Sequence, residues 1–153
     1  MNKSKFFGLL MIMTLIFSGI VLAQNDEPEF TATLTGAAEV PGPGDSDGTG
    51  TAMIRLNKNK AEACFEISVE NIDAATAAHI HEAPEGEAGP PVVTLSPAPK
   101  DEDGEESESD CVSVDPLLVE RIIMNPARFY VNVHNAEFPD GAIRGQLSMV
   151  KAD

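Results

Sequence analysis

Short runs in which apolar residues occupy every second position recur along this chain. Successive side chains of a strand point to opposite faces, so a period of two predicts strands with one buried face. Clear examples begin at Phe30, Ala52, Ala63 and Phe129. Stretches rich in Gly, Pro, Asp and Asn separate the runs and predict turns. The alternation therefore predicts an antiparallel β-sandwich or barrel.

The strands and one helix can be placed along the chain. A helix is expected after Asp115, because Asp is a good N-cap and Pro116 suits the first helical position. Asn125 and Pro126 should end this helix. We expect an all-β, Greek-key-like antiparallel sandwich with one short helix, its strands covering residues 30–36, 52–56, 63–69, 76–82, 92–95, 129–134 and 142–149.

The last two strands should form a hairpin. For their apolar residues to share a face, the numbers of paired residues must have an even sum, so the loop must have an odd length. A three-residue loop of residues 139–141 meets this condition. On that register His134 faces Gln146, and Arg144 lies diagonally beside His134.

The amino-terminal segment has the organisation of an export signal. Two lysines precede an apolar run, and residues 21–23 have the pattern of small residues at which a signal peptidase cuts. We expect cleavage after Ala23, with residues 24–29 as a disordered lead-in and residues 30–150 as one domain. The protein would then be secreted or periplasmic. A retained membrane anchor is the alternative, but the apolar core is short for a full span.

The mature chain would be strongly acidic. Loss of Lys3 and Lys5 would take the formal net charge from −15 to about −17. Nucleic acids and anionic membranes need a basic footprint, so neither is an expected partner, whereas cations are compatible. Residues 101–110 hold seven acids. We expect a solvated loop there; a calcium site is the alternative, although the ordered spacing of an EF-hand loop is missing.

Cys64 and Cys111 are the two cysteines of the chain. An exported protein meets an oxidising compartment, so we expect these residues to form a disulfide. A metal thiolate or two separate thiols are the alternatives. Neither has the CxxC-type spacing that would favour it.

All three histidines lie in expected strands. His79 and His81 are two residues apart, so they should project to the same side, about 7 Å apart, as two imidazoles sharing one metal ion would require. His134 would be a third ligand if the fold brings it alongside. Neutral imidazole suits copper and zinc, and we expect copper, with zinc as the alternative. The other interpretation is three exposed histidines paired with nearby acids.

Three stretches of the chain form a recognisable set of motifs. They are Phe30-Thr-Ala-Thr-Leu-Thr-Gly-Ala-Ala-Glu-Val-Pro, Thr76-Ala-Ala-His-Ile-His-Glu with Gly89-Pro-Pro-Val-Val, and Tyr130-Val-Asn-Val-His-Asn with Phe138-Pro-Asp-Gly-Ala-Ile-Arg-Gly-Gln-Leu. Together these motifs resemble the CHRD family, the domain named from chordin. The resemblance implies a secreted or periplasmic antiparallel β-sandwich. It also implies that the three histidines and residues 143–147 are characteristic positions.

A looser resemblance is to copper-zinc superoxide dismutases, which share the sandwich, a His-x-His-Glu stretch and a later copper histidine. It implies that His79, His81 and His134 are copper ligands and that Arg144 is a candidate anion guide. No histidine lies between His81 and His134. A bridging ligand and a histidine-rich zinc site are therefore absent, so such a site would hold copper alone.

Three functions follow from these patterns. The first is a copper-binding redox protein that acts on superoxide, and the second is a metal carrier without catalysis. The third is an extracellular recognition or adhesion module that binds another protein, in which the histidines are incidental. Residues 44–48 match the pattern Gly-x-Ser-x-Gly, but they lie in an expected loop rich in Pro, Gly and Asp and not in the strand–turn–helix context of a nucleophile elbow.

Overall fold

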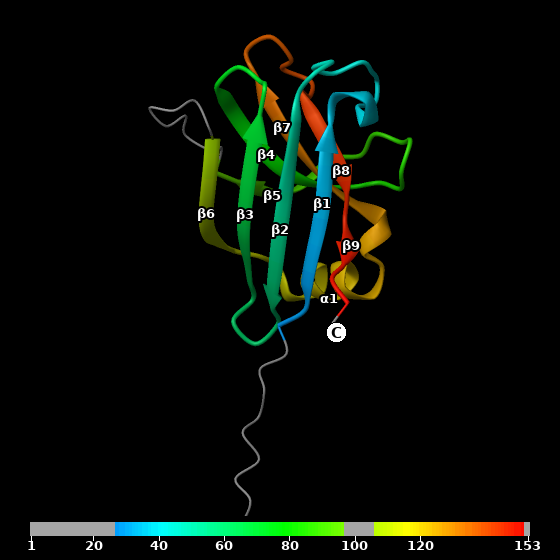
Figure 1. Ribbon diagram of the computed structural model, residues 1–153. Coiled ribbons are helices and arrows are strands. Elements are labelled where there is room, and N and C mark those ends of the chain that lie inside the picture. Colours follow the sequence, from blue (N-terminus) through cyan, green and yellow to red (C-terminus); the bar gives the residue numbers. More distant parts are fainter. Residues whose placement is uncertain (1–26, 97–105, 152–153) are drawn as a thin grey trace, which may run out of the picture.

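The computed structural model describes residues 27–96 and 106–151, and these form strands, one α-helix and two short 3₁₀ helices (Figure 1). The elements in chain order are β1 (Glu29–Thr35), η1 (Gly36–Ala38), β2 (Thr49–Asn57), β3 (Glu62–Glu70), β4 (Ala75–Glu82), β5 (Pro91–Leu95), β6 (Glu106–Ser113), α1 (Pro116–Met124), η2 (Pro126–Arg128), β7 (Phe129–Asn135), β8 (Ile143–Gln146) and β9 (Ser148–Met149).

The strands form one continuous antiparallel sheet that folds back on itself. Their order is β5-β4-β7-β8-β1-β2-β3-β6, and β9 pairs with β1. The neighbours β4–β7 and β8–β1 are far apart in sequence, as in Greek-key folds. Figure 1 shows β1, β2 and β3 in front of β4, β5 and β7, with α1 at the lower end. The predicted all-β sandwich with one short helix is confirmed.

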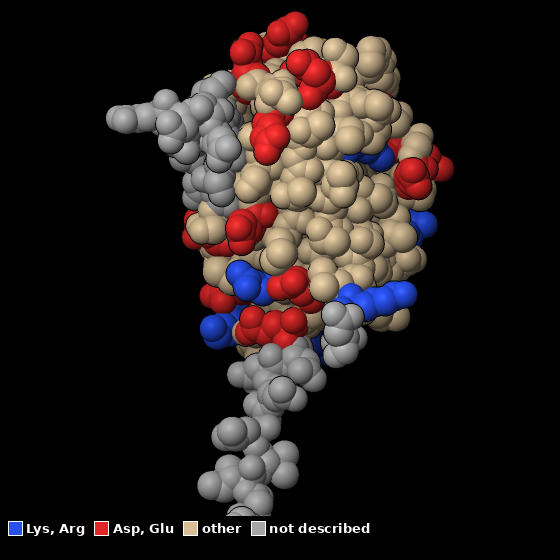
Figure 2. All heavy atoms as spheres, in the orientation of Figure 1, with Lys and Arg blue, Asp and Glu red and all other residues tan. Residues whose placement is uncertain are grey.

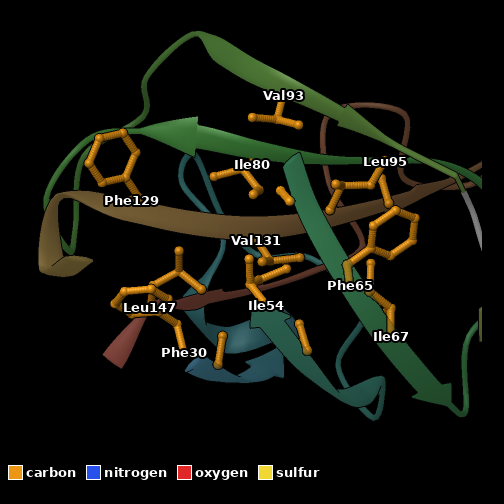
Figure 3. Packing of buried hydrophobic residues seen from close by; sticks show 14 of the residues in the cluster. Phe30, Ile54, Phe65, Ile67, Ile80, Val93, Leu95, Phe129, Val131 and Leu147 are labelled. Carbon is orange, nitrogen blue, oxygen red and sulfur yellow. The ribbon is translucent and has the colours of Figure 1, made fainter. Parts of the chain in front are cut away.

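The hydrophobic core lies between these two layers. Ile80 and Val93 point inward from one layer and Ile54 and Phe30 from the other (Figure 3). The alternating apolar residues, which were expected to face the core, are almost fully buried; Phe30 and Ile54, for example, have 0% exposure. The period of two therefore identified the buried face of each long strand.

Helix α1 begins and ends where the sequence predicts. The backbone N–H of Leu117 donates a hydrogen bond of 2.7 Å to the Asp115 carboxylate, and Pro116 is the first helical residue. Leu118, Val119 and Ile122 are buried against the sandwich. Among the described residues, no helix is long and apolar enough to cross a membrane.

The first strand begins at Glu29, one residue before the expected start of the domain. Glu29 is already in β1 and pairs with Arg55, and the Pro28 carbonyl accepts a hydrogen bond of 3.1 Å from the Leu56 N–H. The end of the expected lead-in is therefore held against the sheet by backbone hydrogen bonds. The predicted signal peptide of residues 1–23 lies outside the described residues.

The predicted disulfide is present. Cys64 and Cys111 are directly opposite each other on β3 and β6 and are bonded. This pairing also corrects the expectation of a solvated loop over residues 101–110: residues 106–110 belong to β6, and residues 101–105 lie outside the described part. An edge strand can form through backbone hydrogen bonds to its one neighbour, even when its side chains are polar. Charged side chains on such a strand also discourage pairing with other protein chains.

The register predicted for the last hairpin is wrong by four residues. Tyr130, not His134, faces Gln146, and Arg144 pairs with Asn132. The sum of paired numbers is even, as predicted, but the connection between β7 and β8 spans residues 136–142 and is not a three-residue turn. The even sum of paired residue numbers correctly assigned side chains to the two faces of β7 and β8, but it did not determine the length of the loop. Arg144 is still one diagonal step from His134.

Charge is distributed unevenly over the face seen in Figure 2. Acidic side chains gather at the upper end and toward the edges, while neutral residues cover the middle, over β1 and β2. Thr33 of β1 and Thr51 of β2 are exposed and directly paired. The acidic composition is therefore concentrated away from the centre of this face.

Candidate metal centre

The three histidines lie on the face of β4 and β7 that points away from the hydrophobic core. His79 and His81 alternate with the buried Ala78 and Ile80 along β4. His134 comes from β7, where it pairs with Ala77 and is therefore diagonal to His79. The predicted same-side projection of His79 and His81 follows from this alternation.

The imidazole rings form one cluster. The ring centroid of His79 lies 5.6 Å from that of His81 and 5.1 Å from that of His134. His79 Nδ1 is 3.2 Å from His134 Nε2. One ring nitrogen of each histidine lies within 4.8 Å of the others. Among the described residues, this is the one group of three or more possible metal-binding side chains with such spacing.

Backbone carbonyls determine the protonated nitrogen of two of these rings. A carbonyl only accepts, so His81 Nδ1 must donate its hydrogen bond of 2.8 Å to Gly89 O, and His134 Nδ1 must donate that of 3.0 Å to Pro139 O. In neutral rings, Nε2 is then the unprotonated nitrogen; in His134 it faces His79 Nδ1 at 3.2 Å. This is the usual arrangement of a histidine held for metal binding.

His81 Nε2 has no hydrogen-bond partner among the described residues, although it is buried. A buried polar atom without a partner costs free energy, commonly about 1–3 kcal/mol. A metal ion between the rings would satisfy this atom. The donor set therefore fits a metal that prefers nitrogen ligands.

The environment favours neutral imidazoles. Burial lowers the pKa of His79, and the positive charges of protonated His134 and His81 lower it further. Burial is also the main cause of the lowered pKa of His81 and of His134, and it outweighs their hydrogen bonds to carbonyls. Neutral rings can give their lone pairs to a metal.

Tyr130 and Arg144 extend the site on one side. The Tyr130 ring stacks on His81, with centroids 4.8 Å apart and planes at 14°. The Arg144 guanidinium carbon lies 3.7 Å from the centroid of Tyr130. Arg144 Nη2 donates a hydrogen bond of 2.9 Å to Glu87 O. At 2% exposure Arg144 is a buried side chain, so the structure offers little of it to solvent.

A buried carboxyl group, that of Glu39, interacts electrostatically with Arg144. Glu39 comes from the loop after η1, and its Oε1 accepts a hydrogen bond of 2.6 Å from Asn132 Nδ2. Burial raises the pKa of Glu39 to about 7, although Arg144 and the hydrogen bonds from Val40 and Asn132 oppose that rise. A polar layer therefore continues from the histidines to this loop.

Sequence reasoning found the three histidines and Arg144 but missed three neighbours: Tyr130, Asn132 and Glu39. The first two could have been found, because even-numbered residues of β7 share a face with His134. Glu39 could not have been found in this way, because it lies in an irregular loop. The alternation of residues in strands says nothing about where a loop side chain points.

The fold and the cluster define a class: an antiparallel β-sandwich with three histidines gathered on one outer face. The chain belongs to the CHRD domain family, whose model matches residues 30–147. CHRD domains are typically extracellular modules. A search of curated proteins found no match.

Proposed function

We propose that this CHRD-domain protein is exported and binds one copper ion through His79, His81 and His134. The observation that carries the proposal is the convergence of one nitrogen from each ring, with His81 Nε2 buried and unpartnered among the described residues. Hydrogen bonds from His81 and His134 to carbonyls orient both rings. The expected export signal supports an extracellular or periplasmic location.

The donor chemistry supports copper, with zinc as the alternative. All three donors are imidazole nitrogens, which suit both metals. The two cysteines are bonded to each other and therefore supply no thiolate. Bound copper would supply one-electron redox chemistry. The chain itself supplies ring orientation and neutral donors.

The test is a copper titration of the mature protein beside a triple variant in which all three histidines are replaced by glutamine. We expect one copper per chain in the wild type and none in the triple variant. Thr51→Gln, on an exposed strand position, is a control that should bind like the wild type. Stoichiometric binding by a folded triple variant, or none by the wild type, would refute the proposal.

Superoxide dismutation is the second candidate function. It is favoured by the partial exposure of the histidine residues, although His81 Nε2 itself is buried. The copper-loaded protein should remove superoxide, and the triple variant should not. If the wild type and the triple variant both remove superoxide only at the background rate, the site would instead serve a metal carrier.

A recognition module predicts a different result. If the protein acts by binding another extracellular protein and the histidines are incidental, the triple variant should retain that binding and the wild type should take up no copper. The titration therefore separates this alternative from both copper functions.

A further inference from the structure

The position of Arg144 suggests a role other than contact with a substrate. Its side chain is 2% exposed and lies against the Tyr130 ring. An anion approaching from solvent meets the partly exposed histidines, whereas the guanidinium is covered. What Arg144 does touch are groups that in turn hold His81.

Two chains of contacts lead from Arg144 to His81. In the first, the guanidinium lies 3.7 Å from the Tyr130 centroid, and Tyr130 stacks on the His81 ring with centroids 4.8 Å apart. The stack restrains the plane of the imidazole. A guanidinium over an aromatic face is attracted by the ring quadrupole, and this attraction strengthens when water is excluded.

The second chain of contacts runs through the loop between β4 and β5, residues 83–90. Arg144 Nη2 donates to Glu87 O at 2.9 Å, which ties down the loop two residues before Gly89. Gly89 O accepts from His81 Nδ1 at 2.8 Å, and Tyr130 Oη is 3.4 Å from the same carbonyl. The Gly89 N–H donates to Tyr130 Oη at 3.3 Å. Tyr130 therefore contacts both the imidazole and its hydrogen-bond acceptor.

We propose that Arg144 is a positioning residue: through Tyr130 and the carbonyls of Glu87 and Gly89, it holds His81 with Nδ1 protonated and Nε2 directed at the other histidines. The consequence for copper rests on the proposed function. The orientation of His81 does not, because it is a property of the metal-free protein.

The shape of the guanidinium is essential to this role. A planar guanidinium stacks on a ring while donating sideways to a carbonyl, whereas a lysine ammonium is a compact charge that cannot do both. Arg144→Lys keeps the charge that would compensate Glu39 and attract an anion. It therefore separates positioning from charge.

The first measurement is made on the metal-free protein. Long-range ¹H–¹⁵N NMR of histidine side chains reports which nitrogen of His81 is protonated. We expect a single Nδ1–H form in the wild type and a mixture of tautomers in Arg144→Lys. Arg55→Gln, on an exposed position of β2, is the control and should match the wild type. An unchanged single tautomer in folded Arg144→Lys would overturn the proposal.

Tyrosine variants test the proposal if Arg144→Lys does not fold. Tyr130→Phe keeps the stack and loses the contacts with Gly89, while Tyr130→Leu loses both. The share of the Nδ1–H tautomer should fall in the order wild type, Phe, Leu. A leucine variant indistinguishable from the wild type would contradict the contact chain.

The second measurement is copper affinity by competition with a chelator. Loss of groups that orient a ligand typically lowers metal affinity about 10–100-fold, and we expect this range for Arg144→Lys and Tyr130→Leu. If Arg144 acted only by its charge, the lysine variant would bind copper like the wild type, which would overturn the proposal. Absence of copper binding in the wild type would refute the proposed function, while the NMR result would still decide the role of Arg144.

Discussion

Glu39 is a buried carboxylate whose pKa of about 7 exceeds its ordinary value of 4.5, chiefly because of burial. The folded protein therefore binds this proton more tightly than the unfolded chain does. The stability that Glu39 contributes is fully present below pH 4.5 and is lost as the pH rises through 7. The loss is at most about 3 kcal/mol.

Glu39→Gln should remove this dependence, because glutamine has no proton to lose and can still accept from Asn132. Relative to the wild type, the variant should become more stable between about pH 5 and pH 8, measured by urea unfolding at intervals of about one pH unit. Glu66→Gln, at an exposed position of β3, should show no such gain. A stability difference between Glu39→Gln and wild type that stays constant with pH would contradict the account.

Gly89 allows the loop of residues 83–90 to approach β4 closely. A Cβ atom at this position would lie 2.0 Å from Glu82 O, far inside van der Waals contact with a backbone atom. Gly89→Ala should therefore displace the loop and weaken the hydrogen bond from His81, with a destabilisation of about 1–3 kcal/mol. Gly86→Ala is a comparison in open space, although its φ of +81° adds backbone strain of its own.

The readout for Gly89→Ala is the tautomer of His81 together with the free energy of unfolding. The Gly86 variant should lose some stability but keep His81 as a single Nδ1–H form. Equal tautomer populations in the Gly89 variant and the wild type would show that the loop does not orient His81.

At the residue scale, sequence reasoning reached the histidines because all three occupy regular strand positions. Alternation alone is enough to assign such a residue to one face of its strand. It assigned His134 and Arg144 to one face correctly. It could not show that Arg144 is covered, because the covering segment is a Gly- and Pro-rich loop without periodicity.

At the scale of elements, β6 depends on its disulfide. The strand sits at the edge of the sheet, and Cys111 is bonded to Cys64 directly across from it. In the chain-entropy model, a disulfide across this separation stabilises a fold by roughly 4 kcal/mol. The Cys64→Ser/Cys111→Ser variant should lose stability of this order.

Amide hydrogen exchange locates the effect. Without the disulfide, the amides of β6 should lose protection first, because the strand has a hydrogen-bonded neighbour on one side only. The amides of β1 and β7 should stay protected. Uniform loss of protection in all strands would mean that β6 is no more dependent on the bond than the rest of the sheet.

Elements with an apolar alternation were predicted well, and β6 was not, because the seven acids of residues 101–110 outweigh any strand pattern. Its position comes from a disulfide between residues 47 apart in sequence, a long-range constraint. The hairpin between β7 and β8 shows a second limit. Parity determines faces, whereas loop length depends on contacts of the loop with the rest of the molecule.

For the whole molecule, metal binding should be coupled to folding stability and pH. Copper at roughly a hundredfold excess over its dissociation constant would add about 3 kcal/mol, or roughly 10 °C in Tm for a domain of this size. Protons compete for the three imidazoles, whose pKa values lie below the ordinary 6.5 because of burial.

The copper-induced rise in Tm should therefore be full above about pH 6.5, persist somewhat below it, and then shrink as the imidazoles protonate. Calorimetry from about pH 4.5 to about pH 8, with and without copper, measures this. The triple glutamine variant should show no rise at any pH. A rise of equal size in the triple variant would show that copper stabilises the protein elsewhere, for example at acidic surface residues.

The most direct test of the central claim is Cu(II) electron paramagnetic resonance of the mature protein loaded with one equivalent of copper. We expect one homogeneous signal with splitting from nitrogen ligands, lost when His79, His81 and His134 are replaced by glutamine. A mixed signal with oxygen ligands, unchanged in the triple variant, would contradict a three-histidine copper site.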